Sequence, residues 1–107
     1  MKRFLKLPRF SFTRAMIEYA PETHGVYGMF EGEGIIYIGK AVDRMTIKTC
    51  LLLHQDGSFG DCTMKATACA WEITSWPSAR ETELLAAFFK AHNHDPRCQA
   101  ATARAHS

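Results

Sequence analysis

The chain has 107 residues, a formal net charge of +2 and an apolar fraction of 47%. This length predicts one small domain over residues 1–107, with a single core of two layers. No apolar run is long enough to cross a membrane, and the mild charge permits a nucleic-acid partner without requiring one. Because the basic first eight residues lack the apolar stretch of a signal peptide, we expect a cytoplasmic protein.

The cysteines are irregularly spaced and include no Cys-x-x-Cys pair. This spacing indicates neither a zinc site nor a disulfide framework. We therefore expect reduced thiols that pack as small apolar side chains at all four positions, which are Cys50, Cys62, Cys69 and Cys98.

The first half of the chain predicts a helix followed by a hairpin. Apolar residues recur at helical spacing over 11–19, with Ser11 as a cap and Pro21 just beyond the end. The stretches 25–30 and 35–40 are rich in β-branched and aromatic residues and flank a glycine-rich turn. We read these two stretches as paired antiparallel strands.

The second half predicts a helix, a strand and a final helix. The apolar side chains of 43–54 lie mostly on one helical face, and either Asp43 or Thr46 could cap that helix. A short apolar strand over 68–74 precedes a helix that runs from Pro77 to about His92. The order predicts an α/β fold, or α+β by stricter definitions, with a small three-stranded antiparallel-type sheet flanked by helices.

We place the folded core at about residues 11–99. The tail over 100–107 has no clear packing pattern, so we expect it to be frayed. No repeat or linker divides the chain.

Two tyrosines in the predicted hairpin are the main functional signal. Paired strands lie about 5 Å apart, so Tyr27 and Tyr37 could converge on one site, and Lys40 would add a positive charge. Two hydroxyls and an ammonium suit phosphate chemistry. The alternative is that both tyrosines are packing residues and that Lys40 is a solvated strand end.

These residues resemble the GIY-YIG nuclease superfamily over about residues 25–98. The stretch Gly25-Val26-Tyr27 resembles the first motif of the family, and Tyr37-Ile38-Gly39-Lys40-Ala41 resembles the second. His54 matches a position that commonly holds histidine or tyrosine, and Glu81 resembles the metal-binding glutamate. Glu83 is a second candidate for that role. Further along, Pro96 and Gln99 resemble the proline and asparagine that close the family pattern.

The resemblance implies a metal-dependent endonuclease that hydrolyses phosphodiester bonds in DNA. Glu81 would hold Mg²⁺ or Mn²⁺, while Tyr37 would be the general base or would orient the attacking water. Tyr27 would form hydrogen bonds nearby, and His54 would bind a tyrosine or a phosphate oxygen. Lys40 or the metal would lower the pKa of the phenol toward neutral pH. Taken alone, His54 and Glu81 could instead be ordinary helix-end residues.

One departure from the family pattern concerns charge. Relatives usually carry an arginine four residues before the histidine position, and here that residue is Cys50, with Arg44 and Lys48 nearby. A thiol provides no permanent charge. A second reading is therefore a catalytically weakened module that binds nucleic acid without cutting it, and a third is a protein-interaction domain. A domain of this size would need self-association or a partner protein for specificity.

Overall fold

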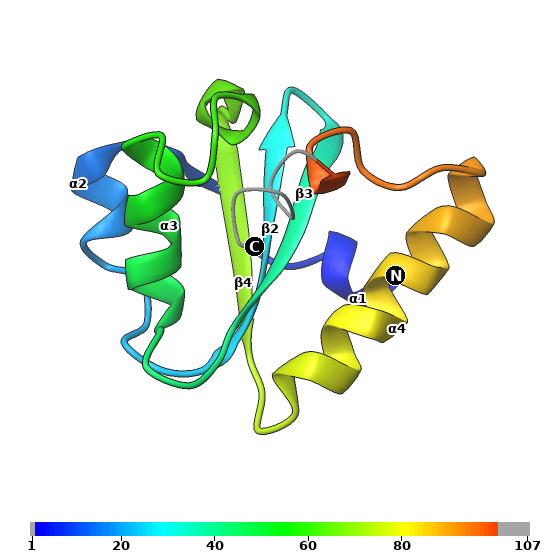
Figure 1. Cartoon of the computed structure of the whole chain (residues 1–107), viewed down its shortest axis with the longest axis horizontal. Helices are drawn as coiled ribbons and strands as arrows, with labels where there is room; N and C mark the ends of the chain where they lie inside the picture. The colour runs from blue at the N-terminus through cyan, green and yellow to red at the C-terminus, as the bar shows by residue number, and fades with distance from the viewer. Residues whose placement is uncertain (1, 101–107) are drawn as a thin grey trace.

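The computed structural model describes residues 2–100 as an antiparallel sheet with helices on both faces (Figure 1). The strand order is β1-β4-β2-β3, and every neighbouring pair is antiparallel. The strands are β1 (Phe10–Ser11), β2 (Gly25–Glu31), β3 (Gly34–Ala41) and β4 (Ala68–Ile73). The α+β class is confirmed, but the sheet has four strands, not the expected three. The extra strand is only two residues long, which is too short for a periodic sequence signal.

The helices form two groups on opposite sides of the sheet. Figure 1 shows α2 and α3 over one face and α1 and α4 over the other. In chain order the helices are α1 (Lys2–Leu5), α2 (Arg14–Ile17), α3 (Ile47–Gln55), the 3₁₀ helix η1 (Cys62–Lys65) and α4 (Pro77–His92). The predicted final helix is confirmed, and it ends where Asn93 adopts a left-handed conformation with φ 61°.

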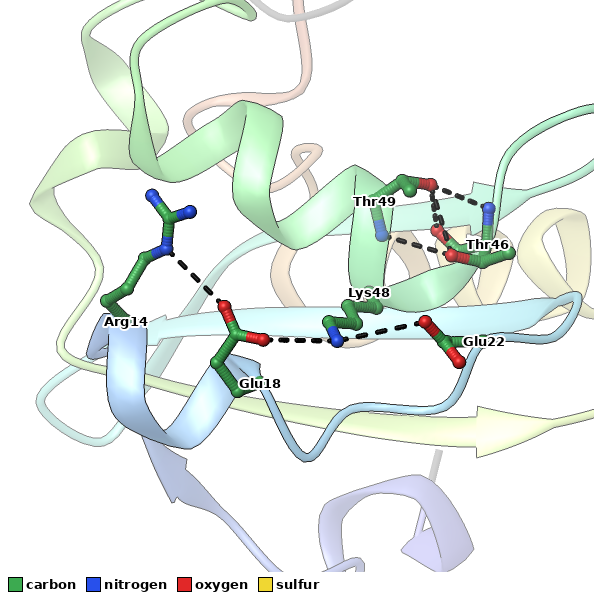
Figure 2. A network of polar contacts seen from close by, with 6 residues as sticks. All are labelled: Arg14, Glu18, Glu22, Thr46, Lys48 and Thr49. Atoms are coloured by element: carbon green, nitrogen blue, oxygen red, sulfur yellow. Dashed lines mark hydrogen bonds and ion pairs between the residues drawn. The ribbon is translucent and has the colours of Figure 1, made fainter.

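The two earlier helices begin later than predicted, for identifiable reasons. Ser11 belongs to β1, and the cap of α2 is Thr13, whose side chain accepts a hydrogen bond from Met16 N. Asp43 has a φ of 58°, which a helix start cannot use, so Thr46 caps α3. Thr46 and Thr49 satisfy each other's backbone amides in a capping box (Figure 2).

Each face of the sheet has its own core, whereas the sequence predicted one. Tyr27, Met29 and Leu51 belong to the core beneath α2 and α3. Val26 and Phe4 belong to the core beneath α1 and α4. Phe4 is 1% exposed although it precedes the predicted core range of 11–99. The predicted fraying of the tail falls almost entirely on 101–107, outside the described residues.

A disulfide bond joins Cys62 in η1 to Cys98 near the end of the described chain. The expectation of reduced thiols is therefore wrong for these two residues, because the fold brings together positions 36 residues apart. Cys50 and Cys69 are free and buried, as predicted. Within residues 2–100, no helix is both long and apolar enough to span a bilayer.

Candidate functional site

A pocket of about 590 Å³ opens beside the outer strand β3. Its walls come from β3, the loop that follows it, α3 and the start of α4. Among the predicted site residues, Tyr37, Lys40 and Glu81 line this pocket, as does Cys50. Side chains from two distant parts of the sequence, β3 and α4, therefore reach one hollow.

The two tyrosines lie side by side on the α3 face of the sheet. Tyr27 is paired with Gly39 and Met29 with Tyr37, so the phenols are diagonal neighbours rather than directly opposite. Their ring centroids are 6.0 Å apart. Gly39 provides the space, because a Cβ there would lie 2.5 Å from Tyr27 Cζ and 2.6 Å from Tyr37 Cε2.

A hydrogen-bonded chain beneath the pocket connects Tyr27, His54 and Thr63. The Tyr27 hydroxyl lies 2.8 Å from His54 Nε2, and His54 Nδ1 lies 2.8 Å from Thr63 Oγ1. The His54 ring also packs 4.8 Å from the Tyr37 ring. Both His54 and Thr63 are 0% exposed. His54 is thus a buried polar residue in contact with both tyrosines, not a solvated helix end.

Both phenols stay protonated at neutral pH. Burial raises the pKa of Tyr27 well above its usual value, and Tyr37 and Cys50 raise it further. Burial also raises the pKa of Tyr37, and the nearby Glu81 charge adds to the effect. The expected lowering of the Tyr37 pKa by Lys40 does not occur here, because burial and the Glu81 charge raise that pKa; lowering by a bound metal stays a prediction.

Glu81 and Lys40 form an ion pair at the α4 wall of the pocket. Lys40 Nζ lies 3.8 Å from Glu81 Oε1 and 3.3 Å from Ser78 Oγ. Burial raises the pKa of Glu81, and the Lys40 ammonium partly offsets this. Glu83, the other glutamate considered, is mostly exposed and pairs with Arg80. Only Glu81 of the two lines the pocket.

The basic residues near Cys50 have different environments. Arg44 lines the pocket, and no ion pair to it occurs within residues 2–100. Lys48 instead lies 3.2 Å from Glu18 and 3.7 Å from Glu22 on the α2 side of α3 (Figure 2). Cys50 is 3% exposed, and burial raises the pKa of its thiol to about 11. Arg44 is therefore the second cation of the pocket.

The pocket offers two carboxylates to a metal ion, Glu81 on α4 and Asp43 in the loop after β3. Among residues 2–100, no group of three or more His, Cys, Asp or Glu side chains could hold a metal. Mg²⁺ prefers oxygen ligands, keeps several waters and is usually bound through one or two carboxylates, so these side chains, with room for water and substrate phosphate, fit its chemistry. The donor set therefore suits Mg²⁺ or Mn²⁺ and does not suit a closed zinc site.

Sequence reasoning missed several residues of the site, and these residues differ in whether the sequence carried a signal for them. Gly39 lies inside a strand, a sign of close approach by other groups. Ser78 lies three residues before Glu81, a spacing that shares a helix face. Thr63 gave no signal, since it lies in a short 3₁₀ turn that the sequence does not predict.

Comparison of the chain with protein-family models, curated proteins and solved structures finds no match.

Proposed function

We propose that the protein is a metal-dependent endonuclease that hydrolyses phosphodiester bonds in DNA. The observation that carries this proposal is the meeting of Tyr37, Lys40 and Glu81 in one pocket. The resemblance of the chain to GIY-YIG nucleases supports the same reaction class. Hydrolysis of a phosphodiester requires a positioned water and neutralisation of the phosphoryl charge. The pocket contains groups suited to both tasks.

The cations and the phenols would have separate tasks. Lys40 and Arg44 would bind the phosphate oxygens and offset their charge. Tyr37 would act as a neutral hydroxyl that orients the attacking water, since its raised pKa makes it a poor general base. Tyr27 and His54 lie behind Tyr37 and would hold its ring in place.

Glu81 would hold the metal ion. A bound Mg²⁺ or Mn²⁺ supplies Lewis-acid stabilisation of the leaving oxygen. Burial already disfavours the charge on this carboxylate, so a divalent cation in the pocket would be a strongly favourable partner for it. The Lys40 ammonium competes for the same oxygen at 3.8 Å.

The two neighbouring glutamates of α4 allow a matched test. Duplex, single-stranded and branched DNA would be incubated with Mg²⁺, Mn²⁺ or a chelator. Glu81→Gln and Tyr37→Phe should abolish nicking, whereas Glu83→Gln should leave it intact because that side chain faces Arg80. Cleavage that persists in chelator, or that ignores the Glu81 and Tyr37 changes, would refute the proposal.

The alternative is a nucleic-acid-binding module with the same pocket and no cleavage. The pairing of Glu81 with Lys40 and the absence of a charged residue at Cys50 favour this reading. Binding would then weaken with rising salt, and no divalent metal would produce nicks. The cleavage experiment separates the two readings directly. Either function would rely on self-association or a partner for specificity, which a concentration series of the binding assay tests.

Cytoplasmic residence stays a prediction, and the Cys62–Cys98 disulfide weighs against it. Disulfides persist mainly in oxidising compartments. Quenching intact cells with acid and then alkylating the free thiols in denaturant would count the oxidised pair as it exists in the cell. Four alkylated cysteines would indicate a reducing compartment, and two would indicate an oxidising one.

A further inference from the structure

Thr63 is a buried polar residue to which the proposed reaction assigns no task. It is 0% exposed, and within residues 2–100 its one side-chain hydrogen bond joins Oγ1 to His54 Nδ1 at 2.8 Å. The other ring nitrogen of His54 lies 2.8 Å from the Tyr27 hydroxyl. Thr63 therefore lies at the far end of the chain of hydrogen bonds that leads to the tyrosines.

The chemistry of imidazole links the two ends of this chain. A neutral histidine has one nitrogen that donates and one that accepts. If Thr63 Oγ1 accepts a hydrogen bond from Nδ1–H, then Nε2 accepts a hydrogen bond from the Tyr27 hydroxyl. If Thr63 donates to Nδ1, then Nε2 donates to Tyr27. The Thr63 hydroxyl is thus coupled, through the His54 ring, to the hydrogen-bonding role of Tyr27.

The backbone around Thr63 is held by the disulfide. Thr63 follows Cys62 in η1, a helix of only four residues. The bond from Cys62 to Cys98 ties this short turn to the end of the described chain. The remaining ties of η1 are its local hydrogen bonds, its packing against α3 and the Thr63–His54 hydrogen bond.

The Cys98 segment is in turn bound to β3 on both sides of Tyr37. Cys98 N donates to Ile36 O at 2.9 Å. The Gln99 side chain accepts from Ile38 N at 3.1 Å and donates to Ile38 O at 2.7 Å. The disulfide therefore joins the segment that supports His54 and Tyr27 to the segment that flanks Tyr37.

We propose that Thr63 is a positioning residue, which orients His54 beneath the pocket and is itself held in place by the Cys62–Cys98 disulfide. The proposal rests on the proposed function only for its effect on cleavage. The orientation of the His54 ring can be measured without any reaction.

The first test uses nitrogen-15 NMR of the histidine rings, in which the pattern of ring couplings reports the tautomer. The His54 signals are assigned by their loss in His54→Gln. Thr63→Val has nearly the same shape but no hydroxyl, and it should change the tautomer pattern of His54. Thr63→Ser should restore the wild-type pattern. Thr67→Val is the matched control, because its hydroxyl binds Gly32 N and not His54.

Cleavage gives the second readout. Thr63→Val should lower kcat by roughly ten- to a hundredfold with little change in KM, the size expected of a small misplacement, and Thr63→Ser should recover most of it. Unchanged His54 signals in Thr63→Val would overturn the positioning role. A changed pattern in a protein that cuts no DNA under any condition would instead overturn the proposed function alone.

The disulfide is tested on the wild-type protein with an excess of a small dithiol. The reductant transfers two electrons and two protons to the bond, giving thiols at Cys62 and Cys98 and a disulfide in the reagent. A thiol count in denaturant should rise from two to four. The His54 ring signals should then shift or broaden while those of the exposed His24 stay unchanged. Unaltered His54 signals after full reduction would overturn the role of the disulfide, even if Thr63→Val does not fold.

Discussion

Replacing Gly39 with alanine tests whether the close approach of the two phenols sets the geometry of the site. An added Cβ would lie 2.5 Å from both Cζ and the hydroxyl oxygen of Tyr27, and 2.6 Å from Tyr37 Cε2. These separations are about 1 Å shorter than ordinary van der Waals contacts. Both rings are at least 96% buried, so neither can swing into solvent.

The expected cost is that of an overpacked core, about 1–3 kcal/mol. For a domain of this size, each kcal/mol lowers the Tm by roughly 4–8 °C. Thermal unfolding followed by circular dichroism should therefore show a Tm lower by roughly 4–24 °C. Because the same displacement moves Tyr37 in the pocket, any DNA cleavage should fall even at temperatures at which the variant is fully folded.

Gly34→Ala is the matched control in the same strand. A Cβ there meets only Glu31 O, at 3.9 Å, and the backbone conformation is an ordinary one. Such a change is neutral or stabilises by up to about 1 kcal/mol through the unfolded chain. Equal Tm values for Gly39→Ala and Gly34→Ala would refute the close-contact account of the tyrosine pair.

Three further predictions follow from charge and burial at the pocket. Arg44→Ala should weaken duplex DNA binding and reduce its salt dependence by about one phosphate contact, whereas Lys48→Ala should do neither. Equal losses of DNA affinity in the two variants would contradict the role of Arg44 as a phosphate-binding residue. Burial raises the pKa of Glu81 in the folded state, so ionisation of this carboxyl destabilises the fold. In denaturant titrations, Glu81→Gln should be more stable than wild type at pH 7, and the difference should vanish below about pH 4. A Glu81→Gln variant less stable than wild type at pH 7 would contradict this prediction. Burial raises the thiol pKa values of Cys50 and Cys69 to about 11, so roughly one thiol in a thousand should be ionised at pH 8. Both cysteines should therefore resist alkylation until the protein is denatured. Rapid labelling of the native protein would show instead that they are accessible.

Local sequence signals predicted the elements that have strong local patterns. The hairpin, the β4 strand and the 16-residue helix α4 each carry clear periodicity or clear end signals, and all three form. The strand β1 does not, because its two residues pair with β4 through contacts distant in sequence. The helix cap at Thr46 was one of two candidates, and only the left-handed backbone of Asp43 decides between them.

The candidate site was predicted as far as residue types allowed. The convergence of Tyr27 and Tyr37 was expected from the hairpin, but the register that puts both on one face depends on the irregularity between Met29 and Phe30, which the sequence pattern does not show. The direction of their pKa shifts could not be predicted, since it depends on burial and on Glu81 rather than on the neighbouring Lys40. Thr63 and the Cys62–Cys98 bond also escaped prediction, because both are consequences of tertiary packing between segments that have no local pattern.

The Gln99 side chain has a consequence for how this sheet meets other molecules. The outer strand β3 would otherwise present free backbone amides and carbonyls on which a second chain could add a strand. Gln99 occupies both polar groups of Ile38, and the Cys98 amide occupies the carbonyl of Ile36. At the opposite margin, β1 is only two residues long. The protein thus carries its own protection against edge-to-edge aggregation, and loss of residues 98–100 would remove it from the longer margin.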